Sequence, residues 1–191
     1  MNPIEQFITE RNLAREVADP MAHLCTVANA DDAGQVHMRT LVLRDVPGGL
    51  GLFINASSPK WPYLSKAVDL LTYWPSTQIQ YRIHADVAPL AADLIKESWQ
   101  LRPPAPKKMD WFYHLKHQQS SEIEDRAALL QSLDDMTAEL PEELHAPEEA
   151  KGLLLNPTRI ERLDLTQENG VHDRTLASFQ DDQWTSQTLV P

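Results

Sequence analysis

Residues 79–87 read Ile-Gln-Tyr-Arg-Ile-His-Ala-Asp-Val, the clearest period-two segment of the chain. Apolar residues hold the odd positions and polar residues the even ones, which is the pattern of a β-strand with one face in a core. The segment therefore predicts a half-buried strand. Its polar face carries Gln80, Arg82 and His84, and such a face is either the solvent side of a sheet or the lining of a site.

Shorter runs of β-forming residues lie on both sides of this segment, and turn residues separate them. They predict strands at residues 23–28, 36–44, 50–55, 70–74, 153–155, 159–165, 175–179 and 184–190. Gln180-Asp181-Asp182-Gln183 has the composition of a hairpin turn. Because strands and helices do not alternate regularly, we expect an antiparallel sheet rather than a parallel one.

Helical spacing predicts helices at residues 4–17, 59–66, 90–101 and 123–140. A serine followed by a proline marks the start of the second helix, and three prolines between residues 103 and 106 end the third. In the fourth helix we expect a buried stripe made of Ile123, Ala127, Leu130, Leu133 and Ala138.

The chain of 191 residues is long enough for one domain with a substantial core. We expect a single domain over 1–191, with the N-terminal helix in 1–18 and the last strands in 152–191. Residues 141–151 are acidic and contain proline, so they are expected to form an exposed connector. The predicted fold class is α+β, an antiparallel barrel with flanking helices.

A formal net charge of −11 and an isoelectric point near 5.0 indicate an acidic surface that repels phosphate-rich polymers and anionic lipid. Nucleic acid and membranes are therefore poor candidate partners. No window approaches about 18 uninterrupted apolar residues and no signal pattern opens the sequence, so we expect a cytoplasmic protein. Cys25 lies in an apolar run, which favours a buried, unreactive thiol, and no Cys/His spacing resembles a zinc site.

Three positions carry charge in unusual places. Lys60 lies in the first turn of a predicted helix, where a bound phosphate would stabilise it; the alternative is a solvated surface lysine. Arg39 lies within an apolar strand and must reach the strand edge or find a partner. His172-Asp173-Arg174 is a compact polar triplet before a strand, and an ordinary turn has the same composition.

From about residue 20 to residue 191, the order of several short motifs resembles the pyridoxamine 5′-phosphate oxidase superfamily of FMN-binding split barrels. The similar motifs are Arg39-Thr40-Leu41-Val42-Leu43-Arg44, Phe53-Ile54-Asn55, Ser58-Pro59-Lys60, Ile79-Gln80-Tyr81-Arg82, Arg102-Pro103, Gln119-Ser120-Ser121 and Gly170-Val171-His172-Asp173-Arg174. In length and spacing the chain is most similar to the less characterised FMN-binding branch. The resemblance implies an antiparallel split β-barrel with flanking helices and an FMN cofactor.

The resemblance also implies the roles of individual residues. Arg39 and Lys60, with Ser58, would hold the phosphate of FMN. The residues that would line the ring and the ribityl chain are Thr40, Leu41, Val42, Phe53 and Ile54. Gln80 would lie at the ring edge. A second subunit would contribute Gln119, Ser120 and Arg174. We therefore expect a homodimer whose flavin site lies at the subunit interface.

The chain departs from the family pattern on both sides of this site. On the cofactor side, Pro59 stands where the family has an arginine, and Leu163 where it has a tryptophan. On the substrate side, the positions that bind the vitamer phosphate in family oxidases read Ser98, Arg102 and Pro106, and Gly170 replaces an arginine. The substrate-binding residues that remain are Arg44, Arg102 and His172, so we expect a small-molecule substrate other than pyridoxamine or pyridoxine phosphate.

Together these features predict an FMN-dependent oxidoreductase acting on an unidentified small molecule. In such an enzyme hydride would arrive at flavin N5, and protein donors near N1 would stabilise the charge that builds there. Two alternatives stay open. One is a flavin-binding carrier or sensor without turnover, and the other is a split barrel that binds haem or a deazaflavin.

Overall fold

The structure is a computed structural model that describes residues 2–64 and 67–191. Its chain divides into two compact units. The sheet unit consists of Met1–Leu52, Tyr63–Ala88 and Leu155–Pro191, and the helical unit of Phe53–Pro62 and Pro89–Leu154. Each unit therefore combines segments that are far apart in the sequence.

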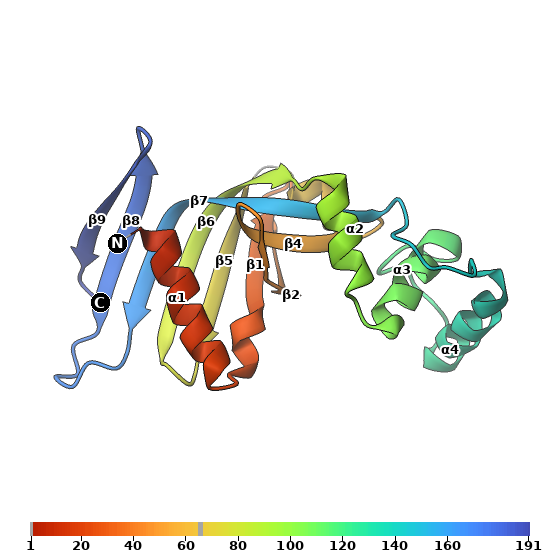
Figure 1. Ribbon diagram of the computed structural model, residues 1–191, viewed down its shortest axis with the longest axis horizontal. Helices are drawn as coiled ribbons and strands as arrows, with labels where there is room; N and C mark the ends of the chain where they lie inside the picture. Colours follow the sequence, from red (N-terminus) through yellow and green to blue (C-terminus); the bar gives the residue numbers. More distant parts are fainter. Residues whose placement is uncertain (1, 65–66) are drawn as a thin grey trace. The chain divides into compact units, whose positions relative to one another are not determined.

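The strands pair into an antiparallel sheet in the order β2-β1-β5-β6-β7-β4-β3, and β8 and β9 continue it from β7 (Figure 1). Their bounds are β1 Leu24–Ala30, β2 Val36–Val42, β3 Arg44–Val46, β4 Gly49–Asn55, β5 Ala67–Trp74, β6 Ile79–Pro89, β7 Ala150–Asp164, β8 Asp173–Gln180 and β9 Gln183–Leu189. This arrangement confirms the predicted α+β class. The predicted strands at 153–155 and 159–165 are one continuous strand, β7.

The register of the central strands sorts their side chains onto two faces. Leu70 in β5 lies opposite Val27 in β1 and Ile83 in β6, and all three side chains are buried. On the other face Leu71 lies opposite Arg82, and both are exposed. The alternation predicted for β6 is therefore confirmed. We call the second face the open face; its side chains include Thr26, Ala28, Met38, Asp69, Leu71, Arg82 and His84.

Helix α1, Pro3–Glu16, packs on the core face of the sheet across β5 and β6 (Figure 1). Phe7 is fully buried and contacts the rings of Trp74 and Tyr81, with centroid distances of 5.5 and 5.0 Å. The Tyr81 hydroxyl donates a hydrogen bond to Glu10 at 2.6 Å, and Arg162 of β7 donates to the same carboxylate at 3.0 Å. The helix predicted at residues 4–17 is therefore confirmed, and an ion pair ties it to β7.

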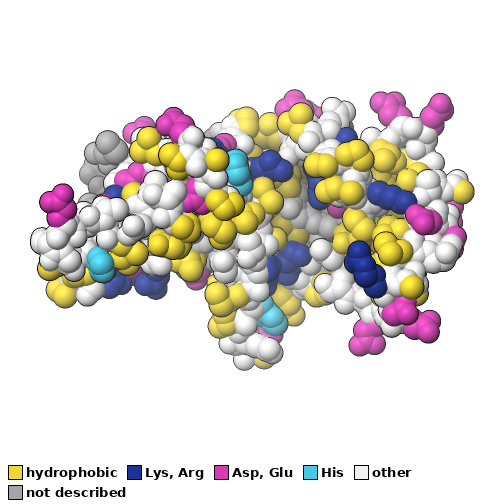
Figure 2. All heavy atoms as spheres, turned by 90° about the horizontal axis from the view of Figure 1, so that it is seen from below, with side chains coloured by type: hydrophobic (Ala, Val, Ile, Leu, Met, Phe, Trp, Pro, Cys, Tyr) yellow, Lys and Arg dark blue, Asp and Glu magenta, His cyan; other side chains and the backbone are white. Residues whose placement is uncertain are grey.

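The helical unit contains α2, Ala92–Gln100, α3, Pro104–Leu115, and α4, Arg126–Asp135, followed by a 3-10 turn at Met136–Glu139. Figure 2 shows acidic side chains at the outer margin of this part of the chain and apolar ones between them. The exposed acidic residues here include Glu122, Glu124, Asp134, Asp135, Glu139, Glu142 and Glu143. This unit thus contributes strongly to the acidic surface expected from the composition.

Helix α3 has no counterpart in the sequence prediction, which interprets the prolines after Arg102 only as the end of a helix. In the structure Pro103 precedes α3, and Pro104 and Pro106 occupy its first turn. A proline breaks no helical hydrogen bond there, because the first N–H groups of a helix have no partner within it. The same prolines therefore end α2 and begin α3.

The predicted helix at 123–140 is shorter in the structure, because Asp125 caps α4 by accepting a hydrogen bond from Ala128 N at 2.8 Å. The predicted buried stripe is wrong: Ile123, Ala127, Leu130 and Ala138 are exposed and Leu133 is half-buried. The side of α4 that faces the protein is shifted by about one residue from the predicted stripe, and the fully buried Met136 follows at the end of the helix. A shift of one position turns a helix by about 100°, which moves the predicted stripe toward solvent.

The helix predicted at 59–66 is a short 3-10 turn at Trp61–Leu64, and the end of the prediction lies outside the described residues. The connector predicted at 141–151 is exposed only in part, since Pro147 is buried and Ala150 already begins β7. The predicted hairpin turn is confirmed by β8 and β9, with Asp181 and Asp182 at positive φ angles of 50° and 59°.

Cys25 is buried at 2% exposure, as expected, and burial raises the pKa of its thiol to about 12. Within residues 2–64 and 67–191, no helix is long and apolar enough to cross a membrane. In the same part of the chain, no three or more His, Cys, Asp or Glu side chains gather closely enough to hold a metal ion.

Candidate functional site

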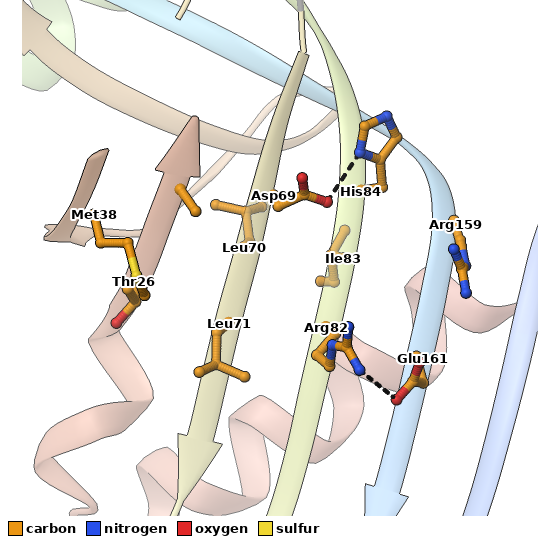
Figure 3. A pocket seen from close by; sticks show the side chains of 11 residues that line it. Thr26, Met38, Asp69, Leu70, Leu71, Arg82, Ile83, His84, Arg159 and Glu161 are labelled. Atoms are coloured by element: carbon orange, nitrogen blue, oxygen red, sulfur yellow. Dashed lines mark hydrogen bonds and ion pairs between the residues drawn. The ribbon is translucent and has the colours of Figure 1, made fainter. Parts of the chain in front are cut away.

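A hollow of about 370 Å³ lies on the open face of the sheet unit (Figure 3). Thr26, Met38, Leu71 and Arg82 contribute to its wall from four neighbouring strands. Figure 3 shows His84 turned toward Asp69, and their side chains lie 3.0 Å apart. The polar face of β6 therefore lines a hollow in the sheet.

A buried carboxylate, Glu161 of β7, organises the charges beside this hollow. Arg82 Nη1 lies 3.3 Å from Glu161 Oε1, and Arg174 Nε donates to the same oxygen at 3.0 Å. Glu161 is 6% exposed, whereas the Arg82 side chain is 60% exposed. Two guanidinium groups on one carboxylate leave one uncompensated positive charge, and this charge favours an anionic or electron-rich ligand.

Gln80 lies two residues before Arg82 on the same face of β6, opposite Tyr73 of β5, and is half-buried. Its amide can donate and accept hydrogen bonds, as the edge of a flavin ring would require. Of the predicted site residues, Gln80 and Arg174 thus belong to strands on the two sides of β7. Neither is among the residues that line the hollow itself.

Arg39 of β2 belongs to the opposite face. Its Nη1 donates a hydrogen bond to Asn29 Oδ1 at 2.6 Å, and burial lowers the pKa of the guanidinium. Asn29 is 8% exposed, and within the described residues its Nδ2 has no hydrogen-bond partner. A buried amide donor without a partner beside an arginine is suited to an anion that would accept from both.

The residues that follow Arg39 in its motif divide between the two faces. Leu41 shares the face of Arg39 and is half-buried, whereas Thr40 and Val42 are exposed on the open face. A single ligand on one face of the sheet would therefore meet only part of the predicted set. Sequence spacing predicts this division, because successive side chains of a strand point in opposite directions.

In the helical unit two predicted motifs meet. Lys60 Nζ donates to Ser58 Oγ at 2.6 Å and to Gln119 Oε1 at 3.3 Å. The backbone N–H of Gln119 donates to Ser57 Oγ at 3.2 Å. The resemblance implied that Gln119 comes from a second subunit; within one chain it already lies beside Lys60. Ser120 is exposed and has a positive φ of 71°.

The other predicted residues of the helical unit border a small slot. Phe53, Ile54 and Arg102 line it together with Trp99 and Lys151. Its volume is about 10 Å³, which is room for one water molecule. The slot thus brings together two residues predicted for the flavin and one predicted for the substrate.

Arg102 of this slot pairs with a buried carboxylate. Asp110 of α3 is 4% exposed, and its Oδ2 accepts from Arg102 Nη1 at 2.6 Å and from Trp99 Nε1 at 2.8 Å. Burial raises the pKa of the Asp110 carboxyl, and the charge of Arg102 and the bond from Trp99 oppose that rise. The pair fixes Arg102 at the edge of the slot.

The last two predicted substrate residues lie apart from these clusters: Arg44 is exposed on β3, and His172 is exposed before β8. Sequence reasoning missed Asn29, Asp110 and Glu161. Asn29 had a usable signal, since it interrupts the apolar run of β1. Asp110 had none, because eight residues and a helix boundary separate it from Arg102.

No known family profile matches the chain. Individual proteins do match. Pyridoxine/pyridoxamine 5′-phosphate oxidase of Acinetobacter baumannii is 32% identical over 197 aligned positions, which cover 100% of this chain and 88% of the relative. The protein of the same name from Shewanella sediminis is 30% identical over 197 positions, covering 100% of this chain and 89% of the relative.

Two solved structures have closely similar folds. PhzG from Burkholderia lata, in complex with tetrahydrophenazine-1-carboxylic acid, has a TM-score of 0.79 at 23% identity, covering 98% of this chain and 90% of its own. A pyridoxamine 5′-phosphate oxidase-related, FMN-binding protein from Nostoc punctiforme also has a TM-score of 0.79, at 18% identity, covering 100% and 99%. The predicted split-barrel fold is thereby confirmed.

The sequence relatives and the fold agree with each other. The match at 32% identity spans the whole chain, and the two solved structures share its fold over 98% and 100% of its length. The chain belongs to the pyridoxine/pyridoxamine 5′-phosphate oxidase family.

Proposed function

We propose that this protein binds FMN and uses it to oxidise or reduce a small molecule. The observation that carries the proposal is the meeting of Ser58, Lys60 and Gln119 in the helical unit. Ser58 lies two residues before Lys60, whereas Gln119 lies 59 residues after it, and together they bring a hydroxyl, a cation and an amide to one place. Such a donor set suits a phosphate monoester like that of FMN.

Lys60 is the main phosphate ligand in this proposal. Its ammonium is half-buried and held by Ser58 Oγ at 2.6 Å, so little side-chain entropy remains to be lost when a phosphate binds. Ser58 accepts from Lys60 through its oxygen, and its own O–H can donate to the phosphate. A charge-assisted contact of this kind contributes about 1.5–3 kcal/mol.

The predicted flavin residues of the sheet unit divide between its two faces. Gln80 lies on the open face, where its amide can contact the edge of a flavin ring. Arg39 and the unpaired Nδ2 of Asn29 lie on the opposite face, where they suit an anion. The positive charge that Arg82 and Arg174 leave beside Glu161 favours the reduced, anionic form of a flavin. FMN, when bound, supplies hydride transfer, and the protein supplies orientation and electrostatic stabilisation.

We further propose that the working protein is a homodimer. Apolar side chains are exposed on the open face: Met38 at 65%, Leu71 at 37% and Tyr73 at 39%. Val36 and Val42 of β2 are exposed on the same side. Soluble monomers seldom leave neighbouring apolar side chains of a sheet uncovered. A second copy of the chain would cover them and add its own residues to the site, as the family resemblance implies.

Anaerobic reduction tests the oxidoreductase part of the proposal. The FMN-loaded protein is mixed with candidate donors, and flavin absorbance is followed by stopped flow. We expect bleaching by at least one small-molecule donor at a rate that saturates with donor concentration. A flavin that stays oxidised with every donor, but is bleached by dithionite, would contradict turnover and favour a carrier.

A further inference from the structure

A buried amide in β1 has a hydrogen-bond donor without an acceptor. Asn29 is 8% exposed, its Oδ1 accepts from Arg39 Nη1 at 2.6 Å, and its Nδ2 has no partner within residues 2–64 and 67–191. A buried donor without an acceptor is destabilising, and an anion that accepts from it removes this penalty. Asn29 and Arg39 therefore offer two donors to one anion beside β2, which lies at one end of the strand order (Figure 1).

His37 lies next to these two donors. It is the direct cross-strand partner of Asn29, and it precedes Arg39 by two residues on the same face of β2. Directly opposite residues of an antiparallel pair have Cβ atoms about 4.5–5.5 Å apart, and alternate residues of one strand lie about 7 Å apart. An anion that bridges Asn29 and Arg39 would therefore lie close enough to the imidazole to interact with a charge on it.

The charges around His37 balance when its imidazole is neutral. Asp31 Oδ2 lies 3.0 Å from His37 Nε2, and this hydrogen bond, followed by one from Gln35 N, lowers the pKa of the Asp31 carboxyl. The ionised Asp31 offsets the charge of Arg39, so Asp31, His37 and Arg39 together carry no net charge. Histidines take up a proton between about pH 8 and pH 5, and a proton on His37 would give the group a charge of +1.

Two further side chains lie near this group. The ring of Tyr63 is nearly parallel to the His37 imidazole, with centroids 6.4 Å apart and 11° between the planes. Tyrosines carry no charge in the pH range in which histidines titrate. Asp32 follows Asp31 in the turn and is exposed, so solvent screens its charge. His37 is therefore the member of this group whose protonation changes the net charge between pH 8 and pH 5.

We propose that Asn29, Arg39 and His37 form a binding site for a phosphate-like oxyanion, and that uptake of a proton by His37 strengthens the binding. The inference goes beyond the proposed function, because the family motifs include neither Asn29 nor His37 and the site can be occupied without a flavin. The oxyanion is either the phosphate group of FMN or a free anion, since both present the same oxygens. Because binding and protonation are coupled, His37 must keep its proton to a higher pH when the anion is bound.

Proton NMR of the imidazole rings tests the proposal, with sulfate as the probe, because sulfate stays doubly charged throughout this pH range. The His37 signal is identified by its absence from His37→Gln. At saturating sulfate we expect its titration midpoint at least about 0.5 pH unit higher than in chloride of equal ionic strength, which corresponds to roughly threefold tighter binding to the protonated form. His114, which pairs with Glu149 at 2.9 Å in the helical unit, is the matched control and should titrate equally in both salts.

Arg39→Gln is the deciding variant, because it removes one positive charge and leaves Asp31 and His37 in place. Its His37 signal should titrate at the same pH in both salts, and Asn29→Ala should reduce the difference between the salts. Equal midpoints in the unaltered protein, or an undiminished difference in Arg39→Gln, would overturn the proposal. Circular dichroism verifies that each variant is folded before its titration is compared.

FMN and riboflavin, added separately in chloride, distinguish the two sources of the anion. If FMN raises the His37 midpoint and riboflavin does not, the phosphate group of FMN occupies the site. A response to sulfate but not to FMN identifies a free anion, and both results support the site. If sulfate acts on His37 while no flavin binds, the proposed function fails and this inference stands.

Discussion

Replacing Lys60 by alanine tests the assignment of the phosphate. The ammonium is half-buried and held at 2.6 Å from Ser58 and 3.3 Å from Gln119, so water screens it less than an exposed charge. Loss of a charge-assisted contact costs about 1.5–3 kcal/mol. At about 1.4 kcal/mol for each factor of ten, Lys60→Ala should weaken FMN binding roughly 10- to 150-fold.

The assay is a titration of FMN with the flavin-free protein, followed by quenching of flavin fluorescence. Lys60→Arg keeps the charge but not the geometry of the ammonium, and should lose less affinity than Lys60→Ala. Lys96→Ala removes one exposed positive charge from the same unit and serves as the matched control. It should bind FMN as the unaltered protein does.

Two results would refute this reasoning. An affinity of Lys60→Ala within about twofold of the unaltered protein would mean that the lysine is only a solvated surface residue. An equal loss in Lys96→Ala would mean that net charge, and not a particular contact, governs the affinity. Thermal melting of each variant verifies that it is folded before its affinity is compared.

Three further predictions concern the fold and assembly. Burial raises the pKa of Asp19, but hydrogen bonds from Ser76 and Met21 outweigh this effect and lower the pKa overall. The ionised Asp19 therefore stabilises the folded state at pH values above the ordinary aspartate pKa. This contribution to folding stability is lost as the pH falls through the lowered pKa. Thermal melting below about pH 4 should therefore show a weaker pH dependence for Asp19→Asn than for the unaltered protein. Gly152→Ala should destabilise the protein by about 1–3 kcal/mol in a thermal melt, since the added Cβ would lie 2.8 Å from Leu90 Cδ1. In analytical ultracentrifugation the FMN-loaded protein should sediment as a dimer, and a stable monomer that keeps its FMN would contradict the shared site.

The sheet was predictable from the sequence because its signals are local. Strict alternation in β6 sets one face apolar, and the pairing partners of that strand repeat the pattern. The turn at Asp181 and Asp182 was recognisable because these residue types tolerate positive φ. The prediction of which side of α4 is buried was wrong. This helix has few strongly apolar residues, so a shift of one position in the pattern changes which side is expected to be buried.

The candidate site was predictable only where the family motifs carry it. Lys60 and Arg39 stood out because a cation in a helix start or an apolar strand needs a partner. Their partners Ser58 and Gln119 were marked by the same family motifs, whereas Asn29 was missed as the partner of Arg39, because that contact depends on how β1 and β2 pair. The pairing of Arg102 with a buried carboxylate was not predictable, because it depends on a helix that begins at prolines.

Binding of FMN is the central claim, and the amount of flavin that the protein retains after desalting tests it most directly. The protein is saturated with FMN, passed through a desalting column, and its flavin and protein absorbance are compared. We predict a yellow protein that retains FMN in a ratio near one per chain. A colourless protein that retains no flavin after saturation, while remaining folded by circular dichroism, would contradict the account.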